Sequence, residues 1–177
     1  MLVQPLPCLR LHQYVDLHRL EVNNIRLLAF DQSTKVTGFS LWEGKKLTDY
    51  GKLDSNVEEN NPIERMSKMY FLIKELLNKH NPGFVVLEGV QFQNNYKTYA
   101  QLSQMQGVIF SLLFEKDIGF LLIEPTAWRS FCGIKGRKRA EHKAAAIQLV
   151  NDTFQIDTDE DTAEAICIGV WASSNIT

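Results

Sequence analysis

The stretch RLLAFDQSTKVTGFSLW, residues 26–42, decides the fold, because it contains two strand patterns joined by a short polar turn. Residues 26–30 read as a buried strand, and residues 36–42 form a second strand with Gly38 inside it. Asp31 comes directly after the first strand. A carboxylate at the edge of a buried strand costs free energy unless a cation compensates for its desolvation. The stretch therefore predicts both a central strand and a charged group at the carboxyl end of that strand.

A third strand and a helix follow these two strands. Residues 47–53 form the third strand, and the glycine-containing joint WEGKKL, residues 42–47, is typical of a hairpin, so the three strands should form an antiparallel meander. Next, Asn61, Pro62 and Glu64 provide the N-cap and first turn of a helix. This helix should end before Pro82. We expect one of its faces to be buried, namely Ile63, Met66, Tyr70, Ile73 and Leu77.

The rest of the chain alternates strands and helices. Residues 84–87 are too short and too apolar for anything but an inner strand, parallel to the first. The later elements are expected as a helix over 96–116, a strand over 119–123, a helical turn over 125–131, and helices over 140–150 and 159–172. The order matches the ribonuclease H-like fold. This is an α/β fold with a five-stranded mixed sheet, three antiparallel strands and then parallel ones, flanked by helices.

Length and composition leave room for one domain. The chain has 177 residues, of which 45% are hydrophobic and 23% charged, so it can bury a single sizeable core. Residues 1–24 lack a sustained period and are interpreted as an N-terminal arm, and residues 25–177 as the domain. No apolar stretch is long enough for a membrane span and no secretion signal is apparent, so we expect a cytoplasmic protein. Three cysteines without paired spacing indicate neither a disulfide framework nor a zinc site.

Four carboxylates stand at the ends of predicted elements. Asp31 and Glu88 close two strands that a strand-helix-strand crossover should make neighbours, and open sheets bind ligands at the carboxyl ends of such strands. Asp161 and Glu164 open the last helix and lie on one face of it, because they are three residues apart. Like charges this close repel each other unless a cation lies between them. Metal-dependent phosphodiester hydrolysis needs roughly four carboxylates to hold two cations, which this pattern provides.

Three of the four acids, taken alone, also have a plainer interpretation. Asp161 lies three residues after Thr158, so it could satisfy backbone donors in a helix capping box. Asp31 could close a turn, and Glu88 could be a surface residue at a strand end. The combination of all these acids at neighbouring strand ends and one helix start favours the metal site.

With these residues in place, the chain resembles the RuvC family of Holliday junction resolvases, in the small form that bacteriophages carry. The resemblance covers residues 25–172, and its most specific parts are LAFDQSTKVTG at 28–38, VVLEGVQF at 85–92 and DTAEA at 161–165. It implies Mg²⁺ as cofactor, with Mn²⁺ as the alternative, two ions per site, and a homodimer that acts on four-way DNA junctions. By the same likeness the catalytic acids and metal ligands are Asp31, Glu88, Asp161 and Glu164.

The chain departs from the family pattern in two places. The family often has glycine two residues after the first acid, where this chain has Ser33, and the fourth acid is commonly aspartate, where this chain has Glu164. The extra methylene of Glu164 can shift one metal site and its preference between Mg²⁺ and Mn²⁺. Asp157, one turn before Asp161, is a reserve candidate for a ligand.

The net charge of -2 does not by itself favour a polyanionic partner, so the distribution of charge matters more than its sum. A dense basic cluster lies around the loop that precedes the helix over 140–150. We expect it to contact DNA phosphates, with a solvated surface as the alternative, through Arg129, Lys135, Arg137, Lys138, Arg139 and Lys143. The resemblance implies that one basic residue of this stretch assists catalysis, and both Lys138 and Arg139 match that position.

Aromatic residues follow Glu88 in a loop rich in glutamine and asparagine. The resemblance implies that this loop reaches the centre of the junction, where an aromatic ring can stack on unpaired bases. We therefore expect Phe92 and Tyr96 to contact DNA. The alternative is a core aromatic at the start of the helix, which is the preferred interpretation for Tyr99. The helix over 96–116 carries a long apolar stripe and is the expected dimer interface.

The leading function is a metal-dependent, structure-selective endodeoxyribonuclease that hydrolyses phosphodiester bonds in Holliday junctions and other branched DNA. One alternative is a nuclease of the same fold that processes RNA or trims ends. Another is a non-catalytic nucleic-acid-binding scaffold, which retention of four acids argues against. We expect no membrane association, and action in the cytoplasm of a bacterial host if a phage encodes the chain.

Overall fold

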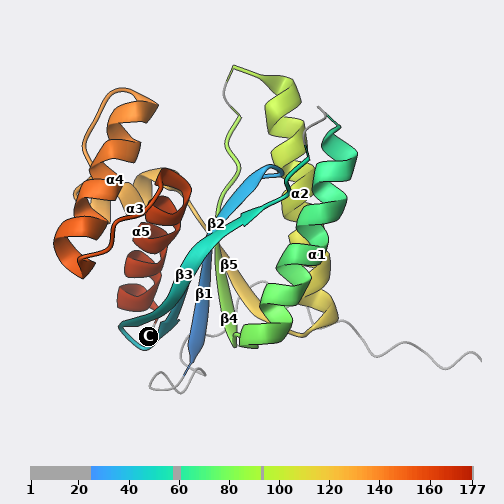
Figure 1. Ribbon diagram of the computed structural model, residues 1–177, viewed down its shortest axis with the longest axis horizontal. Helices are drawn as coiled ribbons and strands as arrows, with labels where there is room; N and C mark the ends of the chain where they lie inside the picture. The colour runs from blue at the N-terminus through green and yellow to red at the C-terminus, as the bar shows by residue number, and fades with distance from the viewer. Residues whose placement is uncertain (1–24, 58–60, 93, 177) are drawn as a thin grey trace, which may run out of the picture.

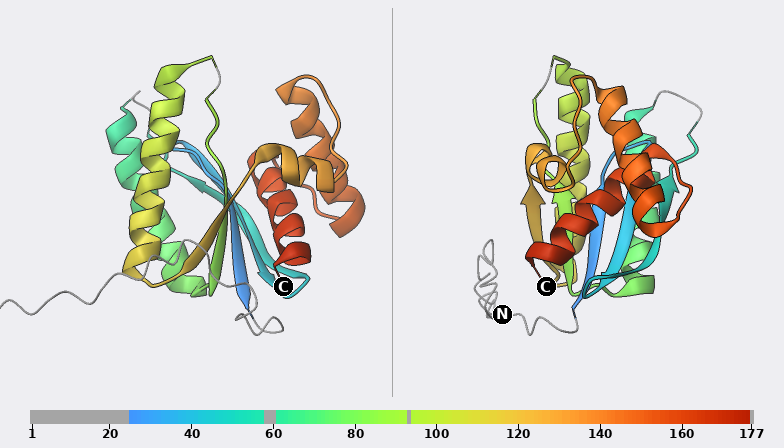
Figure 2. Two further views of the ribbon diagram at one scale, coloured as in Figure 1. Left: turned by 180° about the vertical axis from the view of Figure 1, so that it is seen from behind. Right: turned by 90° about the vertical axis from the view of Figure 1, so that its left-hand side faces the viewer.

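The computed structural model describes residues 25–57, 61–92 and 94–176. The predicted arm, residues 1–24, lies outside these ranges. A central sheet lies between two groups of helices (Figures 1 and 2). The strands are β1 (Arg26–Asp31), β2 (Val36–Glu43), β3 (Lys46–Asp54), β4 (Phe84–Glu88) and β5 (Gly119–Ile123). The helices are α1 (Pro62–His80), α2 (Tyr96–Glu115), α3 (Pro125–Phe131), α4 (Arg139–Phe154) and α5 (Glu160–Asn175).

The sheet has the mixed topology that the sequence predicts. Its strand order is β3-β2-β1-β4-β5, with antiparallel pairing among the first three strands of the chain and parallel pairing of β4 with β1 and β5. Leu28 of β1 pairs with Val85 of β4, which confirms that these two strands are neighbours. Asp31 and Glu88 therefore leave the sheet at the same edge, which faces upward in Figure 1.

Helices cover both faces of the sheet and produce two apolar cores. On one face, α1 and α2 pack against Leu28 and Phe30 of β1. On the other face, α3, α4 and α5 pack against Leu27 and Ala29. Successive side chains of a strand point to opposite faces, so β1 is buried from both sides. This confirms the prediction of a central buried strand that carries Asp31 out to the edge of the sheet.

The helix α1 begins where the sequence predicts. Asn61 Oδ1 accepts hydrogen bonds from the backbone N–H groups of Ile63 and Glu64 at 3.2 and 3.3 Å, which caps the helix. Ile73 and Leu77 are buried as expected, but Ile63 is 78% exposed, so its assignment to the buried face is wrong. The buried residues of α1 begin at Met69, because the first turn extends beyond the part of the helix that packs in the core.

The later element boundaries agree with the predicted ones to within a few residues. β5 and α3 have the expected limits, whereas α4 and α5 each run beyond the expected ends. α4 stops at Gln155, which adopts a left-handed conformation with φ 60°. That conformation is usually taken by glycine, so the sequence carries no clear signal for the end of this helix. Within the described ranges, none of the helices is both long and apolar enough to cross a membrane.

The helix α5 lies unusually close to β2. A Cβ atom on Gly38 would come 2.0 Å from the backbone oxygen of Asp161, so only glycine fits at that position. Further along the same contact, Ser40 Oγ donates to the carbonyl oxygen of Ala165 at 2.7 Å. These contacts fix the start of α5, and with it Asp161 and Glu164, against the sheet.

Candidate active site

Three carboxylates from two layers of the fold converge at the carboxyl end of β1. Asp31 ends β1, and Asp161 and Glu164 lie at the start of α5. One carboxylate oxygen of each residue lies within 4.8 Å of those of the other two. Oxygen ligands arranged in this way suit a hard divalent cation. The structure thus brings together three of the four acids that the sequence singles out.

Burial and mutual repulsion both act on these carboxyl groups. The pKa of Asp31 is raised well above its ordinary value, first by burial and then by the charges of Glu164, Glu88 and Asp161. Burial also raises the pKa of Glu164, where the charge of Lys143 opposes the shift and that of Glu88 adds to it. A bound cation favours the ionised form of each carboxyl group. The donor set and its excess negative charge therefore fit a divalent metal.

Glu88 lies beside this group and is held by two donors. Trp128 Nε1 donates to Glu88 Oε1 at 2.8 Å, and Arg129 Nη2 approaches the same oxygen at 3.4 Å. Burial raises the pKa of Glu88, and these two donors oppose the shift. The charge of Glu88 still acts on Asp31 and Glu164. Glu88 thus belongs to the same electrostatic cluster, although it is not among the three acids whose oxygens can share one ion.

Two glutamines fix the backbone at the end of β4. Gln32 Nε2 donates to the carbonyl oxygen of Glu88 at 2.5 Å, and Gln106 Nε2 donates to the same oxygen at 3.1 Å. Both glutamine side chains are buried. Because Gln32 directly follows Asp31, the first of these bonds ties the ends of β1 and β4 together. Sequence reasoning did not identify either glutamine, since each acts on a backbone atom from a distant part of the chain.

Lys143 lies inside the acidic cluster. Its Nζ is 2.5 Å from Glu160 Oε1 and 3.6 Å from Asp161 Oδ1, and only 12% of its side chain is exposed. The sequence predicts Lys143 as a phosphate contact within a surface cluster. In this structure it is instead an ion-pair partner of acids at the start of α5, because α4 packs against α5 and directs Lys143 toward them.

Two arginines also face the acids. Arg129 Nη2 lies 4.0 Å from Glu164 Oε1, in addition to its contact with Glu88. Although burial dominates the pKa of both glutamates, the charge of Arg139 lowers each of them. No such effect of Lys138 on the described acids is resolved. The charge of Arg139, and not that of Lys138, is therefore among those that act on these two glutamates, which favours Arg139 of the two residues that position in the sequence left open.

Asp159 caps α5. Its Oδ1 accepts from the backbone N–H of Thr162 at 3.1 Å, and its Oδ2 pairs with Lys52 Nζ at 3.4 Å. The alternative in which Asp161 serves a capping box begun by Thr158 is therefore wrong, and Asp161 remains available to a ligand. Asp157, the reserve candidate, is exposed and is not part of the described group of acids that can share an ion.

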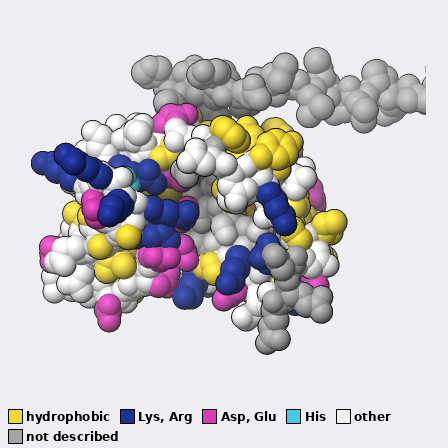
Figure 3. Space-filling view, turned by 90° about the horizontal axis from the view of Figure 1, so that it is seen from above, with side chains coloured by type: hydrophobic (Ala, Val, Ile, Leu, Met, Phe, Trp, Pro, Cys, Tyr) yellow, Lys and Arg dark blue, Asp and Glu magenta, His cyan; other side chains and the backbone are white. Residues whose placement is uncertain are grey.

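The other predicted DNA contacts lie on the surface. Lys135, Arg137 and Lys138 are exposed in the segment between α3 and α4. Figure 3 views the molecule from above, onto the edge where β1 and β4 end, and shows lysine and arginine side chains next to acidic ones on this face. Phe92 and Tyr96 are 64% and 74% exposed, so the interpretation of Phe92 as a core residue is wrong.

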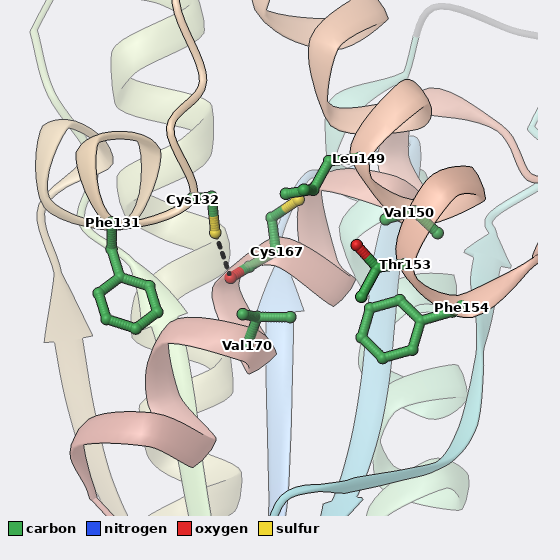
Figure 4. Close-up of a pocket in the computed structure, with 8 residues that line it drawn as sticks. All are labelled: Phe131, Cys132, Leu149, Val150, Thr153, Phe154, Cys167 and Val170. Atoms are coloured by element: carbon green, nitrogen blue, oxygen red, sulfur yellow. Dashed lines mark hydrogen bonds between the residues drawn. The ribbon is translucent and has the colours of Figure 1, made fainter.

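An apolar pocket lies apart from the acids, among α3, α4 and α5 (Figure 4). Its lining residues are Phe131, Cys132, Leu149, Val150, Thr153, Phe154, Cys167 and Val170. Cys132 Sγ approaches the carbonyl oxygen of Cys167 at 3.5 Å, and both cysteines are free thiols. The third cysteine, Cys8, lies outside the described residues. No carboxylate lines this pocket, so the chemistry of the acidic cluster takes place elsewhere.

A family model and individual relatives of known sequence all assign the chain to the same family. A family model described as crossover junction endodeoxyribonuclease RuvC matches residues 27–171. A relative of that name from Dictyoglomus turgidum is 30% identical over 80% of this chain and 92% of its own length. Another from Fusobacterium nucleatum is 27% identical over 81% of this chain and 77% of its own.

Solved structures of low sequence identity share the fold. Thermus thermophilus RuvC, in complex with a Holliday junction substrate, superposes with a TM-score of 0.68 at 13% identity, covering 84% of this chain and 93% of that one. The yeast mitochondrial Holliday junction resolvase superposes with a TM-score of 0.60 at 12% identity, covering 89% of this chain and 83% of that one. The fold is thus ribonuclease H-like, as the order of elements predicts.

Proposed function

Because the chain belongs to the RuvC family of crossover junction endodeoxyribonucleases, we propose that it resolves Holliday junctions and other branched DNA by metal-dependent hydrolysis of phosphodiester bonds. The observation that carries this proposal is the convergence of Asp31, Asp161 and Glu164 within 4.8 Å of one another, with Glu88 alongside. An inactive scaffold would gain nothing from Asp31 and Glu164, whose pKa values are raised by burial and by repulsion from neighbouring acids.

Divalent cations complete this site in the proposal. Asp31, Asp161 and Glu164 would hold one ion, and Glu88 would join Asp31 in holding a second. Mg²⁺ is the expected ion, since all four ligands are carboxylates, and Mn²⁺ is the alternative. When bound, the cations lower the pKa of the attacking water and stabilise charge on the phosphate. The four acids determine where the cations would bind, because β1, β4 and α5, which carry these acids, are packed together.

Basic residues would position the scissile phosphate against the acids. Arg129 approaches both Glu88 and Glu164 through Nη2, and 27% of its side chain is exposed, so its guanidinium can also contact a phosphate oxygen. Arg139 acts on Glu88 and Glu164 through its charge, and we propose that it, in preference to Lys138, stabilises the negative charge of the phosphate during cleavage. Lys143 keeps the start of α5 neutralised beside Asp161.

The surface around the acids would hold the branched DNA. Lys135, Arg137 and Lys138 would contact phosphates without reading sequence, as exposed basic residues beside a nuclease site do. Phe92 and Tyr96 are free to stack on bases, because most of each ring is exposed. We also propose that the enzyme works in the cytoplasm, where its DNA substrate is found.

A homodimer is the proposed active form. Apolar side chains on α2 and on the adjacent β5 form a patch, the α2–β5 patch, which consists of the exposed Phe114 and Leu122 and the partly buried Phe110 and Phe120. Phe114 and Leu122 are 62% and 42% exposed, and β5 is an edge strand of the sheet. An apolar patch beside an unpaired strand edge favours association with a second copy. Two copies would place two acidic clusters on one junction.

Substrate selection tests the proposal against its alternatives. We would incubate the purified protein and Mg²⁺ with a labelled four-way DNA junction, a linear duplex of matched sequence and an RNA–DNA hybrid. The proposal predicts paired cuts near the branch point and little cutting of the other two substrates. Preferential cutting of the hybrid, or removal of nucleotides from ends, would support the RNA- or end-processing alternative. Junction binding without cleavage in Mg²⁺ or Mn²⁺ would support the scaffold.

A further inference from the structure

We propose that Trp128 is a positioning residue for Glu88, which it holds so that a single oxygen of that carboxylate is presented to the metal. This inference rests on the proposed function, because it assigns Glu88 to the metal site. It adds a residue from α3, an element that carries none of the four acids. The indole N–H, and not the bulk of the ring, is the group that does this.

The contact between the two residues is short, and its donor is buried. Trp128 Nε1 donates to Glu88 Oε1 at 2.8 Å, and the tryptophan side chain is 1% exposed. The donor is thus held by the core and not by a mobile surface side chain. A hydrogen bond to a charged acceptor in such surroundings is among the stronger ones in proteins. The orientation of the Glu88 carboxylate is thus set by α3.

The tryptophan itself is held in place from several sides. Pro125, which is buried, begins α3 with one residue between it and the end of β5, and Trp128 is buried in the apolar core that α3 shares with α5. The end of α3 is tied down by a hydrogen bond from the backbone N–H of Ile134 to the carbonyl oxygen of Arg129 at 2.9 Å. The guanidinium of Arg129 lies 4.9 Å from the centre of the indole ring. Trp128 is therefore a rigid support and not a mobile contact.

The two oxygens of Glu88 consequently have different environments. Oε1 accepts from Trp128 and is approached by Arg129 at 3.4 Å, whereas no described residue donates to Oε2. An acceptor engaged by two donors is a poor metal ligand, so Oε2 is the oxygen left for a cation. Partners that orient metal ligands typically change metal affinity or activity by about 10- to 100-fold when they are removed.

A purely structural role for Trp128 makes a different prediction. Loss of a buried indole from the core would lower stability, but it would not change how much metal the folded protein needs. Trp42 provides the matched control, because it is also buried and its Nε1 donates to Ser40 Oγ at 2.9 Å. Trp42 is not bonded to any of the four acids, and loss of its N–H leaves Ser40 Oγ able to donate to the carbonyl oxygen of Ala165, so the contact between β2 and α5 is kept. Replacement by phenylalanine removes one indole N–H and a similar volume at either position.

The experiment compares Trp128→Phe, Trp42→Phe and the wild-type protein. We would measure Mn²⁺ binding by calorimetry without DNA, and junction cleavage as a function of metal concentration. A third protein, with β-(3-benzothienyl)alanine at position 128, keeps the shape of the indole but lacks the N–H, so it serves even if Trp128→Phe does not fold. Thermal unfolding confirms which proteins are folded at the assay temperature.

Trp128→Phe and the benzothienyl protein should bind Mn²⁺ about 10- to 100-fold more weakly and need correspondingly more metal for half-maximal cleavage. Trp42→Phe should keep the wild-type metal dependence. Wild-type metal affinity in the folded benzothienyl protein would overturn the inference. A wild-type protein that binds Mn²⁺ but does not cleave junctions would overturn the proposed function alone, and the Mn²⁺ affinities would still decide the role of Trp128. Failure of the wild-type protein to bind Mn²⁺ would overturn both.

Discussion

At the scale of single residues, Asp31 is the acid whose ionisation is opposed by burial and by all three of the other acids. Its pKa is raised by burial and by the charges of Glu164, Glu88 and Asp161, so the unfolded chain ionises this group at a lower pH than the folded protein does. In the absence of metal, the ionised group therefore opposes folding. The loss of stability begins as the pH rises through the ordinary aspartate pKa, about 3.9, and is complete above the raised pKa of the folded state.

Asp31→Asn should remove this pH dependence. In chelator at pH 7.5 the variant should unfold at a higher temperature than the wild-type protein, and the difference should shrink as the pH falls toward about 4. Adding Mg²⁺ should raise the unfolding temperature of the wild-type protein only, since a ligand stabilises the state that binds it. Scanning calorimetry of both proteins at several pH values measures this. A wild-type protein that is more stable than Asp31→Asn in chelator at pH 7.5 would contradict the account.

Arg139 and Lys138 are adjacent in sequence but should differ in effect. Both side chains are exposed at the start of α4, but only the charge of Arg139 opposes the rise in the pKa values of Glu88 and Glu164. Arg139→Ala should therefore lower the single-turnover cleavage rate by roughly 100-fold, the order found when one preorganised donor is removed from an active site. Lys138→Ala should mainly weaken junction binding, which a salt titration of affinity would report. Equal loss of rate in both variants would remove the distinction.

At the scale of elements, the close approach of α5 to β2 decides where two of the acids lie. Gly38→Ala would place a methyl group 2.0 Å from the backbone oxygen of Asp161, so α5 must shift. We expect a loss of about 1–3 kcal/mol in the free energy of unfolding, as for other overpacked sites, and a larger loss of cleavage than of stability. Urea unfolding and cleavage rates measure the two effects.

Gly107→Ala is the matched control for that substitution. A Cβ on Gly107 in α2 has nothing within 4 Å, and alanine is favoured over glycine inside a helix by about 0.5–1 kcal/mol. This variant should be slightly more stable than the wild-type protein and cleave at the same rate. Full activity in Gly38→Ala would show that the position of Asp161 does not depend on the packing of α5 against β2.

The sequence was sufficient for most of the elements because their signals are local. The apolar run before Asp31, the cap at Asn61 and the proline at Pro125 each mark a boundary that the structure confirms. The end of α4 at Gln155 was not predictable, because a non-glycine residue takes the left-handed conformation there. The exposure of Ile63 was missed for another reason, since helical period alone does not show how far a helix projects beyond the core.

The residues of the site likewise divide into those with a local sequence signal and those without one. Asp31, Glu88, Asp161 and Glu164 could be found because they stand at the ends of predictable elements. Trp128 and Lys143 could not be assigned to their partners, because each contact joins segments that only tertiary packing brings together. A tryptophan in a short helix reads as a core residue, which it also is, and nothing local shows where its N–H group points.

At the scale of the whole molecule, the proposed dimer depends on the α2–β5 patch. Phe114→Asp puts a charge into this patch and should shift the protein from dimer to monomer in sedimentation velocity experiments, with loss of paired cuts on the junction. Phe71→Asp is the control, because Phe71 is 60% exposed on α1 and is not one of the four residues of the patch. A dimer that survives Phe114→Asp but is broken by Phe71→Asp would place the interface on α1.

The most direct test of the whole account is single-turnover cleavage of a four-way junction by the wild-type protein and by Asp31→Asn, in Mg²⁺, Mn²⁺ and chelator. Junction binding is measured in parallel. The account predicts cleavage by the wild-type protein in Mg²⁺ or Mn²⁺ but not in chelator, and a loss of at least about 1,000-fold in Asp31→Asn with binding retained. Cleavage that persists in chelator, or in folded Asp31→Asn at the wild-type rate, would contradict the claim that this acidic cluster is a metal-dependent nuclease site.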